Sequence, residues 1–211
     1  MRIYDGKYLS VTSIVGLRNP FNKAGFESWC QKVGKDPALI ASTSRILGQK
    51  VSEYLNDVSD DCRYLVAPPV DDLEGSLYHA IEEFLKEWEL VDTEQVVKCE
   101  ELNYAGRYDG MIKNKKTGKS ILADWKTFGA WNGKEYKRDS NKIKHTRWQL
   151  TMYANAMGWK DKLAVVVFKN DGSWELEEVE YDEEMIQWIV DNKDLILETI
   201  ENENKKSNKK M

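Results

Sequence analysis

The stretch Gly106–Lys126, GRYDGMIKNKKTGKSILADWK, carries the pattern that decides the fold. Arg107–Lys113 alternates loosely between polar and apolar residues, and Ser120–Trp125 is an apolar run that contains one acid. Both segments are therefore predicted to be short strands. Asn114–Gly118, which joins them, has the composition of a hairpin loop. The stretch predicts a β-hairpin.

Two carboxylates and a lysine lie within this hairpin. Asp124 and Lys126 are two residues apart, so they project from the same face of a strand, and Asp109 lies on the other strand. Aspartate is depleted in strands and costly to bury without a partner. One interpretation is an ion pair on a wet sheet face, which contributes little stability. The other is a divalent-metal site, with the lysine directed at a substrate.

The whole chain has the composition of a folded protein. Its 211 residues are 41% hydrophobic and include eight Trp, which suits one domain with a substantial core. We expect a single domain over residues 1–203, with a mainly helical part (1–90), a sheet core ending in a hairpin and a helix (95–203), and a charged tail (204–211). No apolar run is long enough for a membrane span, and the N-terminus lacks a signal-peptide core. These features predict a cytoplasmic protein without a membrane partner.

The cysteines give no sign of a metal or disulfide framework. Cys30, Cys62 and Cys99 are widely spaced and form no CxxC pair. We therefore expect ordinary buried thiols, and neither a zinc site nor an iron–sulfur cluster.

Charge is distributed unevenly along the chain. The formal net charge is −5, yet residues 111–147 contain eleven Lys and Arg against three Asp and Glu, and residues 173–203 are strongly acidic. The basic segment follows the suspected metal site, where phosphates would have to bind. The alternative interpretation is a solvated loop.

Hydrophobic periodicity predicts the remaining elements. Helices are expected over residues 37–55, 73–88, 146–159 and 182–202. Strands are expected over residues 95–102, 162–170 and 174–180, the last two joined by a turn at Asp171-Gly172. The first of these strands would carry Glu100 and Glu101 towards the hairpin.

Three motifs then occur in a fixed order. They are GRYD at Gly106–Asp109, DWK at Asp124–Lys126 and QLTMY at Gln149–Tyr153. In this order they resemble the GxxD, DxK and QxxxY elements of the PD-(D/E)XK nuclease superfamily, in its RecB-like exonuclease branch. Ser10–Val15, SVTSIV, is also similar to the opening of some RecB-like exonucleases, the mitochondrial genome maintenance exonuclease among them.

The resemblance implies an α/β fold with a restriction-endonuclease-like core, in which a central mixed β-sheet is flanked by helices. It implies a metal-dependent exonuclease that hydrolyses linear DNA, duplex or single-stranded at its ends. The implied setting is phage or bacterial recombination, repair or replication, in a bacterial cell or a phage-infected host, with a recombination protein as a further candidate partner. Two alternatives remain: a structure-specific endonuclease on the same fold, and a catalytically weakened DNA-binding module.

Residue roles follow from the same resemblance. The implied metal ligands are Asp109, Asp124, Glu100 or Glu101, and the backbone carbonyl of Trp125. Lys126 would orient the attacking water and stabilise charge at the scissile phosphate. One or two Mg²⁺ or Mn²⁺ ions suit such oxygen ligands, and they supply activated water and charge neutralisation for phosphodiester hydrolysis.

DNA contacts are expected from the third motif and the basic segment. Gln149 and Tyr153 are four residues apart, so they share one helical face and would point at the DNA backbone or the site. The basic residues would follow phosphates, and Trp131 or Tyr136 could stack on an unpaired base. The basic residues concerned are Lys134, Lys137, Arg138, Lys142, Lys144 and Arg147.

One family feature has two candidate positions. RecB-like nucleases often carry a metal-ligating His in a Gly-x-x-x-His pattern on an early helix. In this chain Gly48–Ser52 has the expected place, with Ser52 where the His would be, whereas Gly75–His79 has the His one helix later. Both remain open at this point. His145, in the basic segment, is expected to neighbour a phosphate or to lie on the surface.

Overall fold

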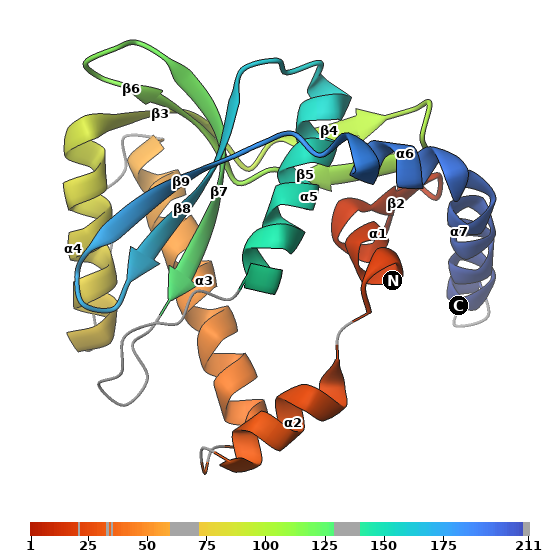
Figure 1. Ribbon diagram of the computed structural model, residues 1–211, viewed down its shortest axis with the longest axis horizontal. Coiled ribbons are helices and arrows are strands. Elements are labelled where there is room, and N and C mark those ends of the chain that lie inside the picture. The colour runs from red at the N-terminus through yellow and green to blue at the C-terminus, as the bar shows by residue number, and fades with distance from the viewer. Residues whose placement is uncertain (21, 33, 35, 60–71, 129–139, 209–211) are drawn as a thin grey trace.

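The computed structural model describes residues 1–20, 22–32, 34, 36–59, 72–128 and 140–208, which form two mixed β-sheets flanked by helices (Figure 1). The strands are β1 (Ile3–Tyr4), β2 (Tyr8–Ser10), β3 (Trp88–Thr93), β4 (Val96–Cys99), β5 (Tyr104–Arg107), β6 (Gly110–Asn114), β7 (Ser120–Phe128), β8 (Lys162–Lys169) and β9 (Trp174–Val179). The helices are α1 (Val11–Arg18), α2 (Lys23–Lys32), α3 (Pro37–Ser59), α4 (Asp72–Glu87), α5 (Ser140–Met157), α6 (Glu183–Asp191) and α7 (Lys193–Asn208). None of the helices in these ranges is long and apolar enough to cross a lipid bilayer.

The larger sheet has the order β3-β6-β7-β8-β9, with β7 and β8 parallel and the other pairs antiparallel. Successive side chains of β8 enter two separate apolar layers, because strand side chains alternate between faces. Val166 packs with Phe84 of α4 on one face, and Val165 packs with Leu150 of α5 on the other. This arrangement explains why β8 is an almost continuous apolar run.

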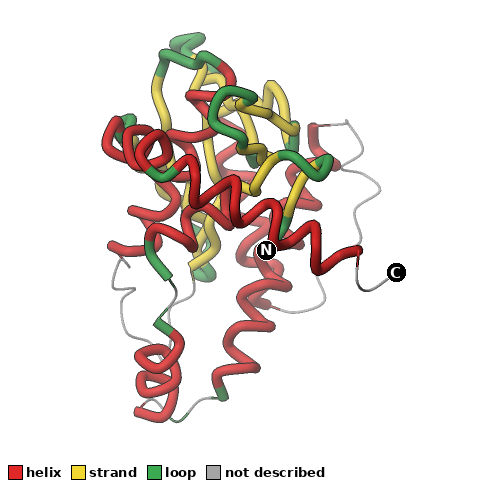
Figure 2. The backbone as a smooth tube through the Cα atoms, turned by 90° about the vertical axis from the view of Figure 1, so that its right-hand side faces the viewer, coloured by secondary structure: helices red, strands yellow, loops and turns green. Residues whose placement is uncertain are grey.

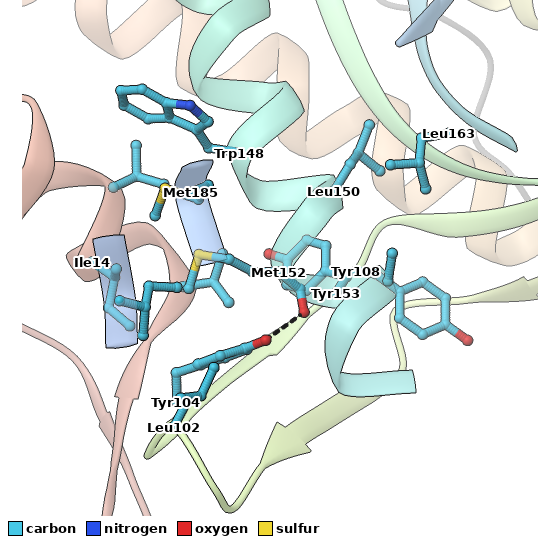
Figure 3. Close-up of a cluster of buried hydrophobic side chains, with 14 of the residues drawn as sticks. Ile14, Leu102, Tyr104, Tyr108, Trp148, Leu150, Met152, Tyr153, Leu163 and Met185 are labelled. Carbon is cyan, nitrogen blue, oxygen red and sulfur yellow. Dashed lines mark hydrogen bonds between the residues drawn. The ribbon is translucent and has the colours of Figure 1, made fainter. Parts of the chain in front are cut away.

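The smaller sheet has the order β1-β2-β5-β4, with β4 and β5 against α5 and β2 against α7. Figure 3 shows its core, in which side chains of α1, β5, α5 and α6 meet. The buried Tyr104 hydroxyl donates a hydrogen bond of 2.9 Å to the Met152 carbonyl, so β5 is held against α5. Figure 2 shows α7 beside the N-terminus, where the Met1 amino group lies 2.9 Å from Glu203 Oε2.

A bent two-stranded ribbon connects the sheets. β3 and β4 are consecutive along one side of it, and β5 and β6 along the other. At the bend the Glu94 N–H donates to the Asp109 carbonyl at 3.1 Å, and the Tyr108 N–H donates to the Gln95 carbonyl at 3.2 Å. Glu94 has φ +55°, the left-handed conformation that non-glycine residues adopt rarely. The ribbon therefore turns from one sheet into the other at Asp109.

The α/β class with mixed sheets flanked by helices is confirmed, but several elements differ from those predicted. The first hairpin strand is broken at Tyr108-Asp109 into β5 and β6, because this is where the ribbon bends. β3 was not predicted: the helix expected over 73–88 ends at Glu87, and Trp88 pairs with Asn114 of β6. The smaller sheet as a separate layer was not predicted.

The last predicted helix, 182–202, is also wrong as one element, since α6 and α7 are separate and α7 continues to Asn208. The backbone N–H of Asn192 donates to the Trp188 carbonyl at 3.0 Å, and its side-chain amide donates to the same oxygen at 2.8 Å. This cap ends α6.

Gly110→Ala should destabilise the fold, because a Cβ at this position would clash with Trp125 Cζ2 and lie 3.3 Å from the Asp92 carbonyl oxygen. Overpacking a filled core costs about 1–3 kcal/mol. Urea unfolding should show this loss. Gly48→Ala is the matched control, because nothing lies within 4 Å of its added Cβ in α3, and Ala favours a helix over Gly. Equal stability of Gly110→Ala and the wild type would contradict the packing described for the bend.

Candidate active site

A cleft of about 530 Å³ lies at the bend between the two sheets. Its walls come from the N-terminal segment, α1, α3, the ribbon, β7 and α5. The lining residues are Arg2, Tyr4, Ser10, Val11, Thr12, Ser13, Ser52, Glu94, Gly106, Arg107, Asp109, Asp124, Lys126, Gln149 and Tyr153. The structure thus brings residues of the three sequence motifs together at one place.

Asp109 lies at the bend and is tied to the neighbouring strand. Its Oδ2 accepts a hydrogen bond of 2.9 Å from the backbone N–H of Trp125. Burial and then the charge of Asp124 raise the pKa of Asp109 to about 7, while Lys126 and the Trp125 N–H act in the opposite direction. Because the charge of Asp124 disfavours ionisation of Asp109, a cation bound beside the two side chains would be stabilised.

Asp124 and Lys126 share one face of β7, as predicted from their spacing, and the Lys126 ammonium donates to Asp124 Oδ1. Asp124 is only 3% exposed. Burial lowers the pKa of Lys126, but the charges of Asp124 and Asp109 outweigh this, so the net shift is upward. The two acids therefore favour the charged form of Lys126.

Gln149 and Tyr153 of α5 both reach the cleft, as expected from their helical spacing. Burial, together with the charges of Asp124 and Asp109, raises the pKa of Tyr153 well above its ordinary value, so its hydroxyl is neutral. The Tyr153 ring packs over Gly106, where an added Cβ would lie 2.6 Å from Cε1. The glycine of the first motif is therefore required by the tyrosine of the third.

The N-terminus of α1 forms another wall. Ser10 caps the helix and accepts a hydrogen bond of 3.1 Å from the Ser13 N–H. The Gln149 side-chain amide donates to Thr12 Oγ1 at 3.4 Å, which joins α5 to α1. Arg2 lies over the Tyr4 ring at 4.6 Å. This wall presents hydroxyl, amide and guanidinium donors, and the positive end of a helix dipole.

Ser52 and His79, the two candidates for the family's histidine position, lie in different parts of the structure. Ser52 of α3 lines the cleft. His79 of α4 faces the β8–β9 turn, where a Cβ on Gly172 would lie 3.1 Å from His79 Cδ2. The structure therefore puts Ser52, and not His79, beside the acids.

The acids of the preceding strand are not where the sequence placed them. β4 ends at Cys99, and Glu100 and Glu101 are exposed in the following turn, outside the cleft. In the ribbon Cys99 pairs with Tyr104, at the end far from Asp109. Glu94 lines the cleft instead, and sequence reasoning missed it. The signal that could have found it is strand pairing, which sets the β3–β4 turn opposite Asp109.

Lys142, Lys144 and Arg147 of the basic segment each contact a different part of the structure. Lys142 Nζ donates to the Thr127 carbonyl at 3.4 Å, and Lys144 is exposed and lies 5.0 Å from the Trp148 ring centroid. Arg147 lies 3.2 Å from Asp182 Oδ2, an ion pair on the side of α6. None of these three lines the cleft.

The remaining residues of the segment that were expected to contact DNA are His145 and a group of aromatic and basic residues. His145 Nε2 lies 2.7 Å from the Asn19 side-chain amide, so it links α5 to the end of α1. Trp131, Lys134, Tyr136, Lys137 and Arg138 lie outside the described residues.

The donor set at the bend fits a hard divalent cation. Asp109 and Asp124 supply carboxylate oxygens, and the pKa of Asp109 is raised partly by the charge of Asp124. Mg²⁺ is commonly held by one or two carboxylates and retains several waters. Within the described ranges no three His, Cys, Asp or Glu side chains gather as a metal-binding group. Asp109 and Asp124 are therefore the carboxylates that would hold such an ion.

No protein-family model matches this sequence, and a search of curated proteins found no match. A solved structure from Eubacterium rectale, described as a candidate exonuclease, has a TM-score of 0.50 and 10% identity, covering 95% of this chain and 85% of its own. This chain shares that fold. The alkaline exonuclease LHK-Exo from Laribacter hongkongensis has a TM-score of 0.48 and 12% identity, covering 97% and 93%. Its complex with dAMP has a TM-score of 0.49 and 14% identity, with the same coverage. The α/β architecture implied by the motifs is confirmed by the fold shared with the Eubacterium rectale structure.

Stability without metal should depend on pH through Asp109. Its folded-state pKa of about 7 lies above the ordinary value of 3.8, so between these values the folded state binds a proton that the unfolded chain has lost. The free energy of unfolding should therefore fall as pH rises through this window. Thermal unfolding in EDTA should show Asp109→Asn to be less dependent on pH than the wild type, and more stable at about pH 8.

Each gain of 1 kcal/mol would raise the melting temperature by roughly 2–4 °C in a domain of this size. Glu100→Gln, an exposed substitution outside the cleft, is the control and should retain the wild-type slope. If Asp109→Asn and the wild type had parallel pH profiles, the environment assigned to Asp109 would be wrong.

Proposed function

We propose that this protein is a DNA exonuclease that hydrolyses phosphodiester bonds with one or two Mg²⁺ or Mn²⁺ ions. The observation that carries the proposal is the convergence of Asp109, Asp124 and Lys126 in a cleft that also contains Gln149 and Tyr153. These are the motif residues of the RecB-like branch, and the cleft lies in a chain that shares a nuclease fold. The proposed setting is DNA recombination, repair or replication in a bacterial cell or a phage-infected host.

Asp109 and Asp124 would hold the ion, with the Trp125 carbonyl as a further ligand. A divalent cation bound there supplies Lewis-acid chemistry that activates water and neutralises phosphate charge. Lys126, protonated near neutral pH, adds a fixed charge against the negative charge that develops at the scissile phosphate. Because its ammonium is already held by Asp124, little reorganisation is needed as this charge develops.

The donors of the cleft wall would bind phosphates of the DNA backbone. Helix N-termini and hydroxyl or guanidinium donors suit phosphate oxygens. Tyr153, whose raised pKa keeps it a neutral phenol, is a hydrogen-bond donor at neutral pH. The other DNA contacts proposed are Lys134, Lys137, Arg138, Lys142, Lys144 and Trp131. Arg147 already has Asp182 as a partner, so its contact with DNA would have to compete with that ion pair.

A DNA-binding module without cleavage is the second candidate. Ser52, a poor metal ligand, stands where many relatives of this branch carry a histidine, so the cleft has fewer protein ligands for a cation. Retention of Asp109, Asp124 and Lys126 in one cleft favours catalysis over this alternative.

Catalysis should be lost when the charges of the cleft are removed. The wild type with Mg²⁺ should degrade duplexes labelled at the 5′ or 3′ end. The end whose label is released first gives the direction of digestion. Asp124→Asn and Lys126→Ala should each slow cleavage by about 10²-fold or more, the scale seen when one charge-stabilising group is removed. Lys162→Ala is a matched control, because Lys162 pairs with Glu178 outside the cleft. Undiminished cleavage by Asp124→Asn would refute the assigned site.

Covalently closed circular DNA should separate exonuclease from endonuclease activity. An exonuclease needs an end, so the wild type with Mg²⁺ should digest linear plasmid and leave the closed circle intact. EDTA should stop digestion of the linear form. Nicking of the circle would indicate the structure-specific endonuclease. Tight binding of linear DNA in EDTA without cleavage on addition of Mg²⁺ or Mn²⁺ would indicate the binding module.

A further inference from the structure

Glu94 and Arg107 form an ion pair at the rim of the cleft. Arg107 Nε contacts Glu94 Oε2 across the bend of the ribbon. The Arg107 side chain is 52% exposed, whereas that of Glu94 is 20% exposed. Both residues line the cleft together with Asp109, so the pair lies beside the path of any phosphate that reaches the acids.

The backbones of both partners are fixed by the ribbon. The Glu94 N–H donates to the Asp109 carbonyl at 3.1 Å, and Arg107 pairs with Val96 in the β4–β5 ladder. Their side chains can therefore change partners without a change in the fold. A half-exposed ion pair contributes little stability, which makes such a change easy.

Arg107 is chemically suited to a second anion. A guanidinium presents five N–H donors in a planar fork that matches phosphate as well as carboxylate. The contact to Glu94 is made by Nε. Glu94, by contrast, is a third acid next to Asp109 and Asp124, and its charge opposes the approach of a phosphate while it remains near the cleft.

We infer that Arg107 exchanges Glu94 for a phosphate of the DNA backbone when substrate enters the cleft. Glu94 is then a built-in competitor that limits how tightly the cleft holds DNA, and Arg107 is a substrate-binding residue. This inference rests on the proposed function, because it takes the ligand to be a phosphodiester. Glu94 lies outside the three motifs, and Arg107 occupies a variable position of the GxxD element.

Binding measurements in EDTA test the exchange independently of catalysis. The anisotropy of a fluorescein-labelled duplex with a single-stranded end would be followed over a series of salt concentrations. Arg107→Gln should weaken binding and reduce the slope of log affinity against log salt by about 0.7–0.9, the loss of one phosphate contact. Glu94→Gln should tighten binding roughly two- to fivefold, as expected when a weak competing ion pair is removed, and should leave the slope undiminished.

A direct readout comes from the Arg107 Nε–Hε signal in NMR spectra, identified by its loss in Arg107→Lys. This signal should move when the duplex is added in EDTA. Glu178→Gln, which breaks an exposed ion pair with Lys162 outside the cleft, is the matched control and should bind DNA as the wild type does.

The outcomes separate this inference from the proposed function. If the wild type digests linear DNA but Arg107→Gln leaves affinity and salt slope unchanged, the exchange is refuted and the nuclease assignment stands. Weaker binding by Glu94→Gln would also overturn the exchange, because Glu94 would then be positioning Arg107. A wild type that neither binds nor cleaves DNA would overturn both.

Discussion

The bend of the β3–β4/β5–β6 ribbon positions both sheets and the cleft. Two backbone hydrogen bonds hold it, one from Glu94 to the Asp109 carbonyl and one from Tyr108 to the Gln95 carbonyl. Because the ribbon turns here, one half pairs with the larger sheet and the other with the smaller sheet. The same bend places the Asp109 side chain against the Trp125 N–H of β7. A straight ribbon would carry Asp109 past β7 and leave no common site.

The electrostatics of the cleft work against the stability of the metal-free fold. Asp124 is almost fully buried, and Asp109 has a raised pKa because burial and its neighbour disfavour its charge. Lys126 offsets part of this cost. The apolar layers of β8 on either side of the larger sheet supply burial that outweighs it. The strand compositions around Asp109 and Asp124 depart from the local rules, and the surrounding core compensates.

The motif residues divide into chemical and packing roles. Asp109, Asp124 and Lys126 supply charge, whereas Gly106 makes room for Tyr153. Gly110, which directly follows the first motif, makes room for Trp125. Gly106 and Tyr153 belong to different motifs, but the Tyr153 ring occupies the space that a side chain at position 106 would need. The reason for the glycine is therefore not visible in its own segment.

Features that depend on local geometry could be predicted from the sequence. Two-residue spacing put Asp124 and Lys126 on one face, four-residue spacing put Gln149 and Tyr153 on one face, and motif order indicated the fold. The tertiary structure decided which early acid reaches the site, Glu94 and not Glu100, and which helix position faces it, Ser52 and not His79. It also decided where the strand through Tyr108 breaks. These outcomes depend on the register of the ribbon and on how the helices pack, which are set by contacts between residues distant in sequence. The pattern along one strand or helix contains no information on such contacts.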